Sequence, residues 1–317
     1  MRVFLKQRPG VGRGIDLPAQ PRSRTMPLRY ILPLALFLLQ QGQCPGADRD
    51  RPEFSAAGRD GPFILHTVKS AYQAGTTKLR VLLPSKVEKN RLYRILYVLP
   101  VEALDGERWG NGLETVRRAG LHDQYGLICV APTFSHLPWY ADHPDDPRIR
   151  QESYLTRIVL PFIEKTYPAT KGKKGRLLVG FSKSGWGAFT LLLRNPNLFA
   201  AAAAFDAPLA LDKPGPFGTG PIFGGRENFE KYRVEKLLKK NGGRLGRGKR
   251  LALLGYYGNF RSHHLKAHGW MDELKIEHHW RDGPRRQHSW GSGWLPEAVA
   301  LLAGAGGDRP EKKPPGK

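Results

Sequence analysis

The sequence predicts an α/β fold in which helices flank a mostly parallel sheet. Short apolar runs alternate along the chain with segments of helical spacing, which is typical of strand–helix–strand units. One of these runs, at residues 175–180, is followed almost at once by Ser182 and a helical segment, so we expect a sharp strand-to-helix turn there. Apolar residues make up 40% of the 317 positions, enough for one large core, which we place at residues 55–304.

The first two strands, expected at residues 63–72 and 77–83, are separated by few residues and should therefore pair antiparallel. The later strands are short and apolar, and we expect them at residues 94–100, 127–131, 175–180, 201–205, 251–256 and 276–280. Helical spacing is found at residues 113–119, 152–165 and 185–194. Residues 206–229 are rich in Pro and Gly and are expected to form a loop, and residues 305–317 a disordered basic tail.

The N-terminal residues 1–47 have the features of an over-extended start followed by a secretory signal peptide. Their apolar run, residues 31–39, is far shorter than the roughly 20 residues of a membrane-spanning helix. Arg29 precedes this run and small residues follow it, so we expect cleavage near Ala47 and export of the mature chain. The alternative is a short core helix at the start of a domain.

The formal charge of +23 favours anionic partners such as acidic polysaccharide or lipid headgroups. No nucleic-acid-binding signature accompanies this charge, so no specific nucleic acid is predicted. The densest basic stretch, residues 231–250, is expected to be a solvated surface. Export would leave a single cysteine, Cys129, in an apolar run, where a small core residue is expected rather than a reactive thiol.

The turn at Ser182 contains the candidate catalytic nucleophile. A serine hydroxyl is a poor nucleophile until an enzyme exposes it, supplies a base and stabilises the oxyanion. A strand-to-helix turn lifts the Ser182 hydroxyl above the sheet and directs the N–H of Lys183 towards the developing negative charge. Gly180 and Ser184 are small enough for the crowded turn, and Ser184 is the weaker nucleophile because it falls in the first helical turn. The alternative is that Ser182 only caps the helix.

The general base is expected after the last strand, where His288 follows the Gly/Pro loop of residues 281–287. Imidazole titrates near neutral pH and therefore suits proton transfer. The chain has nine other histidines, so it is the position after the last strand that selects His288.

From about residue 63 to residue 303 the chain resembles the putative-esterase family of α/β-hydrolases, which includes esterase D, feruloyl esterases and mycolyltransferases. The shared pieces are Val98-Leu99-Pro100, Trp139-Tyr140, residues 160–168 (Leu-Pro-Phe-Ile-Glu-Lys-Thr-Tyr-Pro), the turn at Ser182 and His288-Ser289-Trp290. The resemblance implies an α/β-hydrolase fold and an oxyanion hole made by the backbone N–H groups of Lys183 and a residue near Val101. The chain has Val101-Glu102 where the family often has His-Gly.

The third member of a catalytic triad is the least determined. The resemblance implies an acid after the strand at residues 251–256, but only Asn259 follows that strand closely, and it carries no charge. Asp206, directly after the preceding strand, is our preferred acid, and Asp282 is a third candidate. Because no carboxylate closely follows the strand at residues 251–256, the alternative of a non-catalytic hydrolase-like protein stays open.

Other clusters carry less information. Five histidines near the C-terminal end raise the question of a metal: His263, His264, His268, His278 and His279. Adjacent histidines on a strand point to opposite faces, and we identified no Cys or clustered acid beside them, so no metal and no cofactor are predicted. Four aromatic residues flank motifs near one rim of the sheet, where stacking on a substrate and packing in the core explain them equally well: Trp139, Tyr140, Trp186 and Trp290.

The resemblance and the residues together predict a serine esterase that hydrolyses carboxylic esters through an acyl-enzyme on Ser182. Acyl groups on carbohydrate are the substrate that the resemblance suggests. Two alternatives stay open: an acyltransferase that uses the same triad, and a non-catalytic hydrolase-like protein that binds polyanions.

Overall fold

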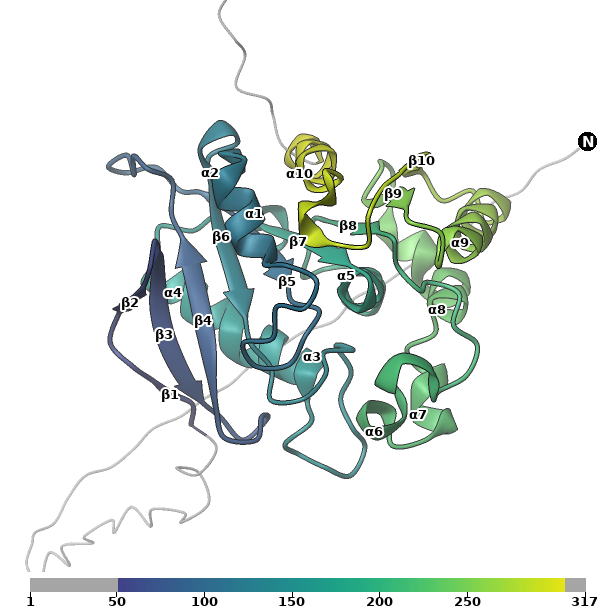
Figure 1. Cartoon of the computed structure of the whole chain (residues 1–317), viewed down its shortest axis with the longest axis horizontal. Coiled ribbons are helices and arrows are strands. Elements are labelled where there is room, and N and C mark those ends of the chain that lie inside the picture. Colours follow the sequence, from purple (N-terminus) through teal and green to yellow (C-terminus); the bar gives the residue numbers. More distant parts are fainter. Residues whose placement is uncertain (1–50, 306–317) are drawn as a thin grey trace, which may run out of the picture. The chain divides into compact units, whose positions relative to one another are not determined.

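A ten-stranded mixed sheet forms the centre of residues 51–305, the part of the chain that the computed structural model describes (Figure 1). The strands are β1 Glu53–Phe54, β2 Gly58–Asp60, β3 Phe63–Lys69, β4 Thr76–Leu82, β5 Arg94–Leu99, β6 Leu127–Pro132, β7 Arg176–Phe181, β8 Ala201–Phe205, β9 Leu251–Tyr256 and β10 His278–Arg285. Their order in the sheet is β1-β3-β4-β6-β5-β7-β8-β9-β10, and β2 pairs with β3. The strands from β6 to β10 in this order pair parallel, whereas β3 and β4 pair antiparallel, as the sequence predicts.

Helices cover both faces of the sheet because its parallel strands are apolar on both sides. The helices are α1 Gly112–Arg118, α2 Leu121–Gln124, α3 Gln151–Ser153, α4 Leu160–Thr166, α5 Lys183–Arg194, α6 Gly220–Phe223, α7 Arg226–Glu230, α8 Val234–Asn241, α9 Arg261–Glu273 and α10 Leu295–Gly304. Helices α1, α2 and α10 lie on one face of the sheet, and α4, α5, α8 and α9 lie on the other (Figure 1). The buried side chains of these two groups of helices belong to two separate core clusters. This architecture confirms the predicted α/β-hydrolase fold.

Several segments differ from the sequence prediction. Strand β10 continues to Arg285, through residues that were expected to form a Gly/Pro loop before His288. Residues 152–165, expected as one regular helix, form α3, a π-helical stretch at Tyr154–Val159 and α4. The expected loop at residues 206–229 contains the short helices α6 and α7, and the helix α9 was not predicted. The predicted leader (residues 1–47) and nearly all of the predicted tail lie outside the described residues. Within residues 51–305, none of the helices has the length and apolar content that crossing a bilayer requires.

Arg250 shows that the basic stretch at residues 231–250 is not wholly a solvated surface. Its side chain is buried before β9, and the guanidinium donates four hydrogen bonds of 2.7–2.8 Å to the carbonyl oxygens of Pro196, Phe199, Ala200 and Leu245. Arg250 therefore joins the loop before β8 to the loop before β9, because its planar group can reach several acceptors at once. Our surface prediction was wrong for this residue.

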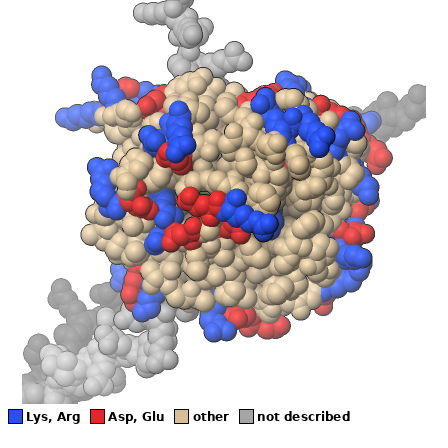
Figure 2. Space-filling model, viewed as in Figure 1, with Lys and Arg blue, Asp and Glu red and all other residues tan. Residues whose placement is uncertain are grey.

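The remaining charged side chains are mixed by sign. On the face seen in Figure 2, acidic and basic side chains lie close to one another in scattered groups. Ion pairs such as Lys78–Asp105 at 2.6 Å join opposite charges in the described part of the chain. Cys129 in β6 is fully buried, and this burial raises the pKa of its thiol. A buried thiol of raised pKa is unreactive, so Cys129 is a core residue, as the apolar run around it predicts.

Candidate active site

Ser182 lies on a strained turn between β7 and α5. Its φ of 52° and ψ of −126° are unusual for a residue with a side chain, and such strain is found at functional sites. The turn is so tight that a Cβ on Gly180 would lie 2.0 Å from the carbonyl oxygen of Ser184. The neighbouring hydroxyl of Ser184 is fully buried and bonded to the backbone N–H and C=O of Phe181, so it is not available as a nucleophile.

The side chains of His288 and Asp206 form a hydrogen-bonded pair beside this turn. Asp206 directly follows β8, has a φ of 42° and is completely buried. Its Oδ2 accepts a hydrogen bond of 2.5 Å from His288 Nδ1. This bond fixes the tautomer of a neutral His288, whose Nε2 is then left with the lone pair that a general base needs.

Aromatic rings hold the imidazole of His288 in place. The ring centroid of His288 lies 4.5 Å from that of Phe181, 4.8 Å from Trp109 and 5.8 Å from Phe260. Trp109 meets the imidazole edge to face, an arrangement that adds attraction beyond simple burial. Trp109 and Phe260 lie on loops, and no periodic pattern in the sequence indicated that they would reach His288.

Ser182 and His288 line one open pocket of about 350 Å³. Within residues 51–305 the structure gives no hydrogen bond between the two side chains, which is common before a substrate closes such a site. The rest of the pocket comes from four loops and combines charged with aromatic side chains. Its other lining residues are Glu102, Arg108, Trp109, Leu137, Lys183, Pro208, Phe217, Asn259 and Phe260.

Two backbone N–H groups are candidates for an oxyanion hole, those of Lys183 and Val101. Lys183 begins α5, where the N–H groups of the first turn have no partner in the helix. Val101 follows β5, and the carbonyl of the preceding Pro100 accepts a 2.7 Å hydrogen bond from the Tyr140 hydroxyl. Because a trans peptide points its C=O and N–H in opposite directions, this bond fixes the Val101 N–H away from Tyr140.

The Lys183 side chain connects the same two segments. Its ammonium lies 3.8 Å from the carboxylate of Glu102, directly after Val101. Burial lowers the pKa of Lys183, while the charge of Glu102 opposes this effect. At the position where the resemblance implies His-Gly, this chain has Glu102, which pairs with Lys183 at the edge of the pocket.

The other two candidate acids have different surroundings. Asp282 pairs with Arg261 at 2.6 Å, and hydrogen bonding from that guanidinium lowers the pKa of the Asp282 carboxyl. Asn259 lines the pocket. Asp206 is therefore the carboxylate that the structure brings to His288.

The predicted aromatic rim is wrong. Trp139, Tyr140 and Trp186 are fully buried, and Trp290 is 2% exposed. Trp139 meets Trp186 edge to face, and Trp290 packs on Phe181 below the site, so none offers an open ring face to a sugar. Core packing, the alternative reading, explains all four.

His264 is a residue near the site to which the sequence gave no role. It is fully buried in α9, and its Nε2 accepts a 2.9 Å hydrogen bond from the backbone N–H of Ala207, next to Asp206. Burial lowers the pKa of His264 to about 4, although the charge of Asp206 opposes this effect. A neutral His264 thus supports the turn that carries the acid.

The fold and the serine turn define the chain as an α/β-hydrolase. Residues 70–253 match the family model described as "Putative esterase", and because this match covers more than half of the chain, the protein belongs to that family. Membership of this family supports ester hydrolysis as the general activity.

A curated relative and two solved structures are similar to the chain. Esterase Rv1288 of Mycobacterium tuberculosis is 26% identical over 140 residues, which are 42% of this chain but only 29% of that protein. An S-formylglutathione hydrolase of Agrobacterium tumefaciens is 18% identical with a TM-score of 0.59, over 80% of this chain and 100% of that one. A ferulic acid esterase of Anaeromyces mucronatus is 18% identical with a TM-score of 0.53, over 83% and 96%. At these identities the solved structures show the shared fold alone.

Proposed function

We propose that this protein is a serine esterase that hydrolyses carboxylic esters through an acyl-enzyme on Ser182. The proposal depends on one observation: the buried Asp206–His288 pair shares its pocket with a serine on a strained strand-to-helix turn. Each member of such a set has a separate task, which is nucleophile, base or orienting acid.

In the first half-reaction the Ser182 oxygen attacks the acyl carbon while His288 Nε2 takes the hydroxyl proton. The C–O bond to the alcohol then breaks, and the imidazolium returns that proton to the leaving oxygen. Water next attacks the acyl-enzyme with His288 again as the base, which releases the acid and regenerates the serine. Asp206, bonded to Nδ1, stabilises the imidazolium in both steps.

The oxyanion of each tetrahedral intermediate would accept hydrogen bonds from the N–H groups of Lys183 and Val101. Removing one such donor in other hydrolases costs about 10²- to 10³-fold in kcat. The Tyr140–Pro100 hydrogen bond supports this role because it restrains the Val101 peptide. The N-terminal end of α5 adds a positive dipole on the same side.

For the substrate we propose an ester that joins an acyl group to a carbohydrate alcohol. The side chain of Phe217 at the pocket is 53% exposed, and it faces the ring of Phe260 at 5.5 Å. The exposed ring of Phe217 suits an aromatic acyl group, with the largely buried ring of Phe260 beside it, whereas Arg108 and Glu102 can hydrogen-bond hydroxyls of the alcohol. The ferulic acid esterase among the similar folds agrees with this choice.

The nucleophile is tested by labelling the full chain with a fluorophosphonate and locating the adduct by mass spectrometry. We expect one adduct on Ser182, none in Ser182→Ala, and continued labelling in the neighbouring control Ser184→Ala. Turnover of p-nitrophenyl acetate should fall by up to about a million-fold in Ser182→Ala and His288→Ala. A folded protein that neither labels nor turns over small esters would overturn the proposal and favour the non-catalytic alternative.

The substrate class needs its own measurement. Release of ferulate from a feruloylated oligosaccharide, compared with methyl ferulate, tests whether the alcohol part matters. Faster hydrolysis of the oligosaccharide ester supports a carbohydrate substrate, and equal rates on the two esters would contradict that substrate.

Export after cleavage near Ala47 is part of the proposal and is checked by the N-terminal sequence of the secreted protein.

A further inference from the structure

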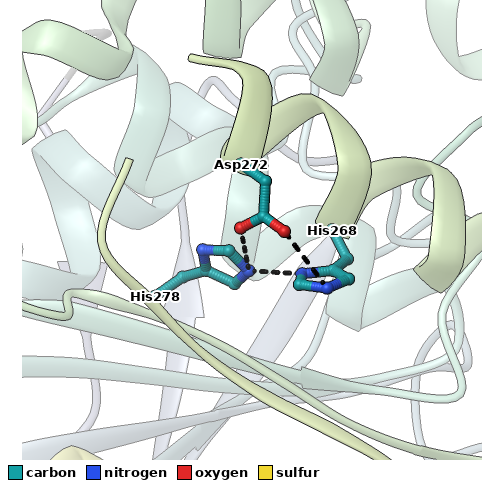
Figure 3. A group of neighbouring side chains, drawn as sticks. All are labelled: His268, Asp272 and His278. Atoms are coloured by element: carbon teal, nitrogen blue, oxygen red, sulfur yellow. Dashed lines mark hydrogen bonds and ion pairs between the residues drawn. The ribbon is translucent and has the colours of Figure 1, made fainter. Parts of the chain in front are cut away.

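Two histidines and a carboxylate converge where α9 ends and β10 begins, outside the pocket of Ser182. His268 and Asp272 lie one turn apart on α9, and His278 is the first residue of β10 (Figure 3). One ligand atom from each residue lies within 4.8 Å of the others. Asp272 is the acid that sequence reasoning missed, because its partner His278 is on another element.

The orientation of His278 is fixed by the backbone. Its Nδ1 lies 2.8 Å from the carbonyl oxygen of Ile276, which can only accept a hydrogen bond, so Nδ1 carries the proton. Neutral His278 therefore directs the lone pair of Nε2 at His268 Nδ1, which is 2.8 Å away. A ring N–H bonded to a backbone carbonyl is the usual support of a metal-binding histidine.

The ring of His268 is placed by two neighbours. Its Nε2 lies 3.3 Å from Asp272 Oδ2, and its ring stacks on Trp280 at 4.6 Å with an angle of 11°. In the absence of an ion, a proton on His268 Nδ1 is donated to Nε2 of His278 across 2.8 Å. A divalent ion that displaces this proton would meet the lone pairs of both nitrogens.

The distances fit a transition-metal ion. With metal–nitrogen bonds of about 2.0–2.1 Å, nitrogens 2.8 Å apart subtend about 86°, and opening to a tetrahedral angle needs a shift of only about 0.5 Å. Asp272 Oδ1 lies 3.9 Å from His278 Nε2 and can move inwards, since its side chain is 60% exposed. Two imidazoles and one carboxylate suit zinc and similar ions, with water completing the shell.

We propose that His268, Asp272 and His278 bind one zinc-like divalent ion that fastens α9 to β10. This function goes beyond ester hydrolysis. It also differs from the sequence analysis, which predicted no metal. The neighbouring Lys249 repels a cation at His278. We therefore expect an affinity in the micromolar range rather than the tight binding of a site with four charged ligands.

The test is a zinc titration of the chelator-treated full chain by calorimetry in a non-coordinating buffer. We expect one ion per chain and a thermal midpoint that rises by several degrees with zinc. His268→Gln and Asp272→Asn should each weaken binding at least about tenfold while the protein stays folded. The matched control is His279→Gln, which removes the adjacent histidine on the opposite side of β10 and should leave binding unchanged.

A second readout locates the ion. Because Trp280 stacks on His268, bound Cu²⁺ should quench its fluorescence, and Trp280→Phe should lose most of that quenching. The proposal is overturned if the wild-type chain binds no zinc at about 1 mM, or if His268→Gln and Asp272→Asn bind it as well as wild type. Neither result depends on esterase turnover, so the metal site and the proposed function can fail separately.

Discussion

The replacement Asp206→Asn tests the least expected member of the candidate triad. The carboxylate is completely buried, and its Oδ1 has no hydrogen-bond partner within residues 51–305, so its interaction is directed at His288. Asparagine has nearly the same shape but no charge. Its amide can also donate to Nδ1, which would place the imidazole proton on Nε2 and block the acceptance of the serine proton.

The expected loss follows from the charge and the tautomer. Opposite unit charges centred about 4 Å apart attract by about 4 kcal/mol at an effective dielectric constant of about 20. Losing that attraction when the imidazolium forms lowers kcat about 10³-fold, and the wrong tautomer brings the loss towards about 10⁴-fold. KM should change little, because Asp206 is absent from the pocket lining.

The assay is p-nitrophenyl acetate hydrolysis by the folded variant, with urea unfolding as the check on stability. Asp282→Asn is the matched control, since it removes a carboxylate bonded to Arg261 at the surface and should keep kcat within about threefold. If Asp206→Asn stays within tenfold of wild type, the assignment of the acid is refuted. A large loss in Asp282→Asn instead would move the acid to β10.

Three further predictions concern stability. Arg250→Met should lower the free energy of unfolding in urea by about 3 kcal/mol or more, because buried carbonyls lose their donor, while the exposed control Arg247→Met changes it by less than about 0.5 kcal/mol. Gly187→Ala should cost about 1–3 kcal/mol, since a Cβ there lies 2.0 Å from the ring of Tyr140; a loss below about 0.5 kcal/mol would contradict that contact. His264, with a pKa of about 4 folded and 6.5 unfolded, binds its proton mainly in the unfolded state between these values. Stability should therefore fall by up to about 3 kcal/mol from pH 7 to pH 4, and His264→Gln should flatten that fall.

The sequence predicted the elements that follow directly from local patterns. Buried parallel strands are continuous apolar runs, so β5 to β9 were found within one or two residues. The turn at Ser182 was found because a strand, a small residue and a helix follow one another in the chain. The preference for Asp206 came from chain order, since it directly follows β8.

Other parts of the site depend on contacts that no local pattern records. Trp109 and Phe260 reach His288 from loops whose path is set by the whole fold. The aromatic residues that the sequence placed at the rim, such as Trp186, fill the space below the site instead. Large rings satisfy both roles equally well in sequence, so only the three-dimensional packing separates a core residue from a rim residue.

The position of the acid is linked to the packing at the end of β9. Gly255 has a φ of 51°, and a Cβ there would lie 2.0 Å from Nε1 of Trp294. The indole thus lies against the backbone at the end of β9, the strand after which the resemblance implies the acid. The carbonyl oxygen of Gly255 accepts a 3.2 Å hydrogen bond from the N–H of Asp206. Trp294 and Asp206 thus belong to one arrangement, in which the end of β9 supports the candidate acid through a backbone hydrogen bond.

Helix α9 links the candidate active site to the proposed metal site. His264, His268 and Asp272 recur every four residues and so lie along one stripe of this helix. The first supports the backbone beside Asp206, and the other two face His278 at the start of the strand that leads to His288. A stripe of histidine and aspartate gives little hydrophobic periodicity, which is why the sequence did not predict α9. An ion at its C-terminal end would restrain both the helix behind the acid and the strand before the base.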